Sequence, residues 1–262
     1  MLALVAGVVH AGVAEAKGTA TKATSTKPTA KTTSTKPTKN RSKKRSRKKP
    51  REKVVSRIPT KATLAHTENM PHGYAWPPSK QMRAAEKVCE AQLDELGVPH
   101  KPTATEGRIA DPLIVTDASG AMKLGGIDYI AAWRQGPQKV DCQLALALEK
   151  FGHELYDLGV RQVKFGSIYR WTNVRVNGKT RPFLSRHALG IAMDIVSFID
   201  DAGREANVKK DYPTGDPLLL GIETAVNASG KFRILLTPKN DPISHSDHFH
   251  LEVAVDFTAK QP

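Results

Sequence analysis

Cysteine is scarce in this sequence. Its 262 residues include only two cysteines, Cys89 and Cys142, which lack the spacing of a cysteine metal site. Both lie in segments with helical periodicity. In an oxidising compartment they would form one disulfide between two helices, whereas in a reducing compartment they would be small buried apolar residues. The sequence leaves both alternatives open.

An apolar run long enough to anchor the chain in a membrane is also missing. Residues 1–16, MLALVAGVVHAGVAEA, fall short of the about 20 apolar residues that a transmembrane helix needs. The run ends in Ala14-Glu15-Ala16, which is typical of a signal-peptide cleavage site, so we expect a signal peptide over residues 1–16 and export of the protein. No basic residue precedes Lys17, which indicates a truncated signal peptide or an unprocessed apolar segment.

Acidic residues are nearly absent from residues 17–60. That segment holds 16 basic residues and one acid, Glu52, whereas residues 61–262 carry equal numbers of both signs. The net charge of +14 therefore belongs to a tail. Since this Lys/Thr/Pro-rich tail has little to bury, we expect disorder over residues 17–75, acting as a spacer or as an arm that binds an anionic envelope polymer. The neutral remainder, without interleaved aromatic and basic residues, argues against a specific nucleic-acid site.

The rest of the chain, residues 76–262, has the patterns of a mixed domain. Apolar residues at helical spacing, between a capping residue and a glycine, predict helices at 79–97, 140–159 and 216–230. Apolar and β-branched segments predict a short strand and a turn within 111–124, and strands at 163–171, 190–198, 231–238 and 248–257. Helices early, strands late and hairpin-like connections predict an α+β domain with a small, mostly antiparallel sheet and flanking helices.

Asp194 is an acid inside an apolar strand, in the stretch LSRHALGIAMDIVSF. A carboxylate there is costly unless it has a partner or binds a metal. Alternation along the last predicted strand places His248 and His250 on one face. His187 lies seven positions before Asp194. His187, Asp194 and His250 would be the three protein ligands of a catalytic zinc site, which leaves a fourth position for water. Solvated surface histidines are the alternative interpretation.

Three motifs resemble a known family. SRHALGIAMD (185–194) resembles the S-x-H-x-x-G-x-A-x-D signature of the zinc D-Ala-D-Ala peptidase superfamily, which includes murein endopeptidases and hedgehog domains. SIYR (167–170) resembles its S-x-Y-R element, and HSDHFH (245–250) its H-x-x-H-x-H end. Their order, over roughly residues 85–256, is similar to the bacterial extensin-like C-terminal domain family. The resemblance implies a hedgehog/DD-peptidase-like zinc peptidase fold and a Zn²⁺ cofactor.

The resemblance also implies roles around the zinc ligands, which would be His187, Asp194 and His250. His248 or Asp247 would be the general base, and strand alternation favours His248 because it aims that side chain at the metal face. Arg170 would hold negative charge on the substrate or on the reacting carbonyl oxygen, with a solvated surface arginine as the alternative.

Two further residues are candidates to orient the ligands, namely Ser185 and His245. One residue departs from the pattern. Arg186 stands where the extensin-like family has glutamate, and nothing in the sequence explains it.

These features together predict an exported zinc metallopeptidase of a bacterial periplasm or cell envelope. It would hydrolyse D-amino-acid-containing amide bonds of peptidoglycan stem peptides or cross-links, as a D,D-carboxypeptidase or an endopeptidase. The alternative is a non-catalytic zinc-containing module that binds peptidoglycan and is tethered by the polybasic tail. The sequence leaves open the scissile bond and the oligomeric state.

Overall fold

The computed structural model of the protein describes residues 69–117, 120–134, 136–176 and 178–259. The expected signal peptide (1–16) and residues 17–68 of the expected tail lie outside the described residues. The described part has the α+β composition and the mostly antiparallel sheet that the sequence predicts. Within these ranges, none of the helices combines the length and the apolar surface required to span a bilayer.

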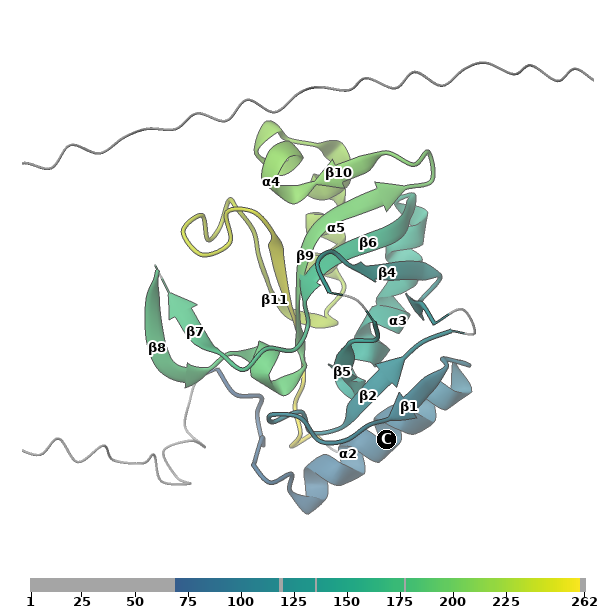
Figure 1. The fold of residues 1–262 in the computed structure, drawn as a ribbon, viewed down its shortest axis with the longest axis vertical. Helices are drawn as coiled ribbons and strands as arrows, with labels where there is room; N and C mark the ends of the chain where they lie inside the picture. Colours follow the sequence, from purple (N-terminus) through teal and green to yellow (C-terminus); the bar gives the residue numbers. More distant parts are fainter. Residues whose placement is uncertain (1–68, 118–119, 135, 177, 260–262) are drawn as a thin grey trace, which may run out of the picture. The chain divides into compact units, whose positions relative to one another are not determined.

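Seven strands form the main sheet (Figure 1). They are β3 (Met122–Leu124), β4 (Ile127–Ala131), β6 (Val160–Ser167), β9 (Ala192–Asp200), β10 (Glu205–Asn207), β11 (Phe232–Leu236) and β12 (Phe249–Val253). Their hydrogen-bonded order is β11-β12-β9-β6-β4-β3, and β10 pairs with β9 beside this path. All pairs are antiparallel except β4 with β6.

Two smaller sheets and the helices complete the described structure. Three strands form one small sheet, β1 (His100–Pro102), β2 (Pro112–Val115) and β5 (Lys139–Asp141), and two form a hairpin, β7 (Asn173–Val176) and β8 (Lys179–Leu184). The helices are α2 (Lys80–Glu95), α3 (Cys142–Asp157), α4 (Val208–Asp211) and α5 (Pro217–Ala228), with 3₁₀ helices η1 (Arg186–Leu189) and η2 (Tyr212–Thr214). The hairpin extends away from the main sheet (Figure 1).

Helices α3 and α5 cover one face of the main sheet and lie behind it in Figure 1. Between them and the sheet lie Phe151 of α3, Ile222 of α5 and Phe249 of β12, all buried. Because side chains alternate along a strand, His250 and Glu252 of β12 point to the opposite face. The candidate site therefore lies on the face that these two helices leave uncovered.

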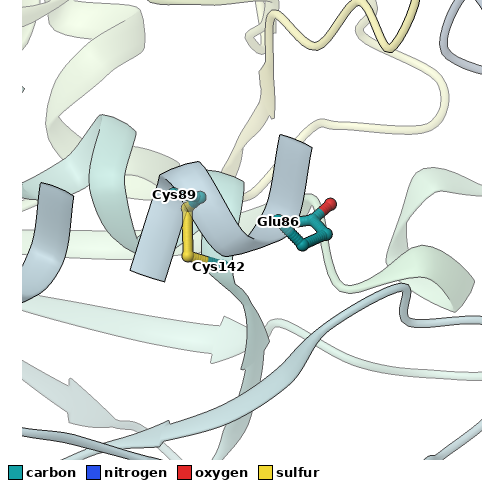
Figure 2. Close-up of side chains that lie close together, drawn as sticks. All are labelled: Glu86, Cys89 and Cys142. Atoms are coloured by element: carbon teal, nitrogen blue, oxygen red, sulfur yellow. A yellow bond between two sulfur atoms is a disulfide. The ribbon is translucent and has the colours of Figure 1, made fainter. Parts of the chain in front are cut away.

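A disulfide joins Cys89 of α2 to Cys142 of α3, with the two Cα atoms 6.1 Å apart. Figure 2 shows this bond with Glu86, which lies one turn earlier on α2. The Glu86 carboxyl lies within 4.8 Å of both sulfur atoms. Because the sulfurs bond to each other, they are not metal ligands in this structure. The bond fixes α2 to the helix that packs on the main sheet.

The folded domain extends further toward the amino terminus than residue 76. Met70 and Tyr74 pack against the hydrophobic core. Asn69 Nδ2 donates a hydrogen bond to Leu184 O, and Phe257 N donates one to the carbonyl of His72. The expectation of a linker up to residue 75 is wrong for these residues, because apolar contacts and backbone hydrogen bonds hold them on the domain.

The three predicted helices and the predicted strands 190–198 and 231–238 match α2, α3, α5, β9 and β11 to within two residues, and the other strands differ more. Strand β6 ends at Ser167 and not at residue 171, because its pairing with β9 becomes irregular after Lys164. Strand β12 begins at Phe249, so His248 precedes it. Five strands, β1 to β5, lie between α2 and α3, where the sequence predicts one short strand.

Glu86 is buried, and its environment disfavours a negative charge. Its Oε2 accepts a hydrogen bond from Gln143 Nε2 at 3.1 Å, whereas its Oε1 has no partner within the described ranges. Burial, helped by the charges of Asp141 and Asp111, raises the pKa of the Glu86 carboxyl well above its ordinary value. The Glu86 carboxyl therefore keeps its proton up to a higher pH in the native state than in the unfolded chain.

A native pKa above the unfolded pKa contributes stability that is present at low pH and is lost as pH rises through the native pKa. Glutamine resembles the protonated acid, so we expect Glu86→Gln to raise the free energy of unfolding at pH 8 and to flatten its fall with pH. Glu95→Gln, at the exposed end of α2, should change that free energy by less than about 0.5 kcal/mol. Urea unfolding between pH 4 and 8 measures both variants. Identical pH profiles for wild type and Glu86→Gln would contradict this account.

Candidate metal centre

The three predicted ligands converge on one point of the uncovered sheet face. His187 Nε2 lies 3.0 Å from Asp194 Oδ1 and 3.1 Å from His250 Nδ1, and His250 Nδ1 lies 2.8 Å from the same oxygen. All three residues are buried. The structure therefore brings together side chains that are 63 positions apart in the sequence.

Strand register and one turn produce this convergence. Asp194 lies on β9, directly opposite His250 of β12 on one side and Ser167 of β6 on the other. His187 arrives from η1, which ends at Gly190 in the left-handed conformation, with φ of 70°. A β-carbon at Gly190 would lie 3.0 Å from the Asp141 nitrogen, so glycine is required both for the backbone angle and for the space.

The donor set fits a metal ion such as zinc. His187 Nδ1 lies 2.7 Å from the Ile168 carbonyl, and His250 Nε2 lies 3.1 Å from Glu252 Oε1, so each ring donates a proton away from the centre. The ring nitrogens that face Asp194 Oδ1 are then lone-pair atoms. Three acceptors at 2.8 to 3.1 Å need a cation or a proton between them. The ligands of a tetrahedral zinc ion are about 3.3 to 3.5 Å apart, which is close to this spacing.

Each candidate ligand is held by a further contact. Besides the two histidine contacts above, Asp194 Oδ2 accepts a hydrogen bond from Ser167 Oγ at 2.9 Å and forms an ion pair with Arg170 Nη2 at 2.8 Å. One carboxylate oxygen is thereby fixed, and the other faces the histidines. Such contacts orient metal ligands and raise their affinity.

The pKa values of the ligands differ because their partners differ. Burial lowers the pKa of His187. Burial also disfavours charge on His250, but Asp194 and Glu252 outweigh it and raise the pKa of His250 to about 9. Burial acts to raise the pKa of Asp194, yet the surrounding histidines hold it well below its ordinary value. The centre therefore contains a permanent negative charge, for which a metal ion and the His250 proton compete.

His248 and Asp247 form a pair beside the ligands. His248 Nδ1 lies 2.7 Å from Asp247 Oδ1, and its Nε2 is directed at the centre, 3.5 Å from Asp194 Oδ1. This Nε2 is buried and has no hydrogen-bond partner within the described part of the chain. Of the two candidates for the general base, His248 faces the centre, and Asp247 lies behind it and holds its ring.

Arg170 is placed at the centre, where it contacts a ligand. It forms an ion pair with Asp194 Oδ2, and its side chain is 46 % exposed. Because β6 ends at Ser167, the segment that carries Arg170 leaves the sheet and turns toward Asp194. Arg170 is therefore half exposed and lies beyond the end of the strand, with a candidate ligand as its ion-pair partner.

The two residues expected to orient the ligands both lie at the centre. Ser185 caps η1, and its Oγ accepts a hydrogen bond from the His187 backbone nitrogen at 3.3 Å. His245 Nδ1 lies 2.9 Å from Asp241 Oδ2, and its ring centroid is 5.0 Å from that of His250. Burial, followed by the charge of His250, lowers the pKa of His245 to about 4, so its ring is neutral at pH 7.

Glu252 organises one side of the centre, and the sequence analysis gave it no role. Its Oε1 contacts His250, while its Oε2 forms ion pairs with Arg186 Nε at 3.3 Å and Arg233 Nη2 at 2.6 Å. Arg186 also donates to the carbonyls of Asn69 and Val253. This buried network gives Arg186, which the sequence alone did not explain, a carboxylate partner and two backbone acceptors. The signal for Glu252 was its place two residues after His250, on the same strand face.

The chain matches the family model described as Extensin-like protein C-terminus over residues 87–260. The chain belongs to this family. No curated protein and no solved structure matches it. The matched region of this extensin-like protein contains every residue of the candidate metal centre and both cysteines.

In this extensin-like domain the centre opens into a cleft of about 540 Å³. One wall is the β7–β8 hairpin, and the other is the segment after β11 that contains Asp241, Ile243 and His245. Arg170, His248 and His250 are among the residues that line it. The centre is therefore accessible to a ligand larger than water.

Ser167 tests whether the contacts to Asp194 matter for metal binding. Removal of its hydroxyl in Ser167→Ala leaves Asp194 Oδ2 with one donor fewer, so we expect metal affinity to fall by about tenfold or more. Ser197→Ala is the matched control, because the Ser197 hydroxyl lies on β9 and donates to Glu205 instead. A competition titration of zinc against a chromogenic chelator measures both. Equal affinities for the two variants would contradict the assignment.

Proposed function

We propose that the extensin-like domain is a zinc-dependent peptidase that hydrolyses amide bonds in peptidoglycan stem peptides or cross-links. One observation carries the proposal, namely that three converging ligand atoms lie beside the Asp247–His248 pair at the wall of an open cleft. A structural metal site is normally closed by four protein ligands, whereas a catalytic site uses three and keeps one position open.

Zinc bound by His187, Asp194 and His250 would polarise a carbonyl group and lower the pKa of a bound water. The protein supplies the movement of the proton. His248 Nε2 is buried and directed at the centre, where it would accept a proton from the attacking water and pass it to the leaving amine. Burial disfavours charge on His248, but Asp194 and, after it, Asp247 outweigh burial and raise the pKa of His248. Asp247 also fixes the ring orientation and would stabilise the imidazolium that forms.

Two other side chains face the reacting group. Arg170 holds Asp194 through Oδ2, and its exposed part provides positive charge on the cleft wall. Asp241 holds the His245 ring through Nδ1, and this ring is neutral at pH 7. A neutral ring carries one proton, so when Nδ1 donates to Asp241, Nε2 has none. Its Nε2 would then act as an acceptor toward the substrate or its water.

The substrate class rests on the motif resemblance. The S-x-H-x-x-G-x-A-x-D and H-x-x-H-x-H patterns occur in the zinc D-Ala-D-Ala peptidase superfamily, whose fold we propose for this domain. Export to the periplasm or cell envelope, through the apolar segment 1–16, would place the enzyme at this substrate. The basic tail would keep it near an anionic envelope polymer and raise its local concentration.

Digestion of purified peptidoglycan tests the activity. We expect the zinc-loaded protein to release new muropeptides, resolved by mass spectrometry, and Asp194→Ala to release none because the ligand set is incomplete. Asp201→Asn is the matched control, since Asp201 is a surface acid that pairs with Arg161. Its activity should equal that of wild type.

Two results would overturn the proposal. One is the absence of new fragments from the metal-loaded wild type, and the other is undiminished activity of Asp194→Ala. Retention of the protein on insoluble peptidoglycan without fragments would instead support the alternative, a metal-containing binding module.

A further inference from the structure

The β7–β8 hairpin is cationic, and one of its basic residues, Arg175, lines the cleft. No acidic residue occurs between residues 158 and 193, a segment that includes the whole hairpin. The hairpin carries three exposed basic side chains, Arg175, Lys179 and Arg181. A β-carbon placed on Gly178, in its turn, would lie 3.7 Å from Ile243 Cγ2 on the opposite wall. The hairpin therefore reaches across the cleft and does not point into open solvent.

Two acidic groups line the cleft, and cationic side chains neutralise one of them, Glu252. Both are held by neighbours: Asp241 by His245, and Glu252 by Arg186, Arg233 and His250. The ligand Asp194 pairs in the same way with Arg170. Asp241 keeps its negative charge within the described residues, because the ring of its partner His245 is neutral at pH 7.

The cations of the cleft are not all neutralised. Arg170 and Arg233 each have a carboxylate partner, whereas Arg175 lines the cleft with no ion pair or side-chain hydrogen bond within the described residues. A metal ion at the centre would add further positive charge. The cleft therefore has an excess of positive charge, with one unpaired guanidinium available to a ligand.

We propose that Arg175 binds a carboxylate of the substrate, so that the cleft selects peptides that carry a free carboxylate near the scissile bond. The inference rests on the proposed function and deepens it by naming the substrate class. A guanidinium presents two parallel N–H donors that match a carboxylate, which an ammonium group or a neutral amide does not reproduce. Arg175 is thus a specificity-determining residue and takes no part in the bond cleavage.

The hairpin itself supplies a control. Arg175 pairs across the hairpin with Thr180, so these two side chains share one face. Arg181 is the next residue along β8, and alternation turns it to the other face. Arg175→Gln and Arg181→Gln remove the same charge from the same exposed hairpin, but only the first removes it from the cleft.

The experiment compares three stem-type peptides, with all carboxylates free, with the terminal carboxylate amidated, or with the side-chain carboxylate amidated. The full-length, zinc-loaded protein is assayed for kcat and KM, and labelled peptides are used to measure Kd by fluorescence anisotropy. The basic tail also attracts anions, so the two arginine variants, which have equal net charge, are compared with each other. Arg175→Lys is included to separate charge from the shape of the guanidinium.

For wild type and Arg181→Gln, we expect amidation of one of the two carboxylates to raise KM and Kd by about 10- to 100-fold relative to the peptide with all carboxylates free. The carboxylate whose amidation weakens binding is the one that Arg175 contacts. Arg175→Gln should lose the preference, and Arg175→Lys should recover only part of it. Cleavage of all three peptides without preference, or a preference that survives in Arg175→Gln, would overturn the inference and leave the proposed function intact. A carboxylate preference in Kd that depends on Arg175, with no cleavage of any peptide, would support the inference and overturn the peptidase activity.

Discussion

The buried carboxylate of Asp194 is the charge on which the candidate centre depends. It lies in the middle of three adjacent strands, with His250 and Ser167 directly opposite it on the two sides. Its two oxygens have separate tasks, because Oδ2 is held by Ser167 and Arg170 while Oδ1 faces the histidines. A charge in this position is costly without partners, and the sheet register supplies them from both neighbouring strands.

The surroundings of the centre form a charge network that goes beyond the ligands. Glu252 connects His250 to two arginines, and Asp247 and Asp241 each fix one histidine. Buried ion pairs of this kind contribute little to stability compared with well-packed apolar groups. Their value here lies in orientation, since each ligand ring has its proton directed away from the centre. Arg175 of the hairpin then remains the arginine of the cleft lining without an ion pair to the described residues.

The prediction from sequence was accurate where local pattern decides structure. Helix α2 begins after Ser79 and α3 after Asp141, because these side chains cap the first turn, as the sequence indicates. It failed where long-range pairing decides. The end of β6 at Ser167 follows from its irregular pairing with β9, and the ordered segment 69–75 follows from contacts with residues near the other end of the chain. Neither the β6–β9 pairing nor the packing of residues 69–75 produces a periodic pattern in the sequence of these segments.

By itself, the sequence determined the α+β composition and the concentration of charge in the tail, and it indicated a candidate ligand set of two histidines and an aspartate, because residue type and spacing carry that information. Only the tertiary structure decided which of the neighbours serve that set. Strand register placed Ser167 and Glu252 against the ligands, turned His248 inward with Asp247 behind it, and gave the unexplained Arg186 a carboxylate partner. Side-chain partnership depends on which strands lie side by side, and residues far apart in the chain do not encode that adjacency locally.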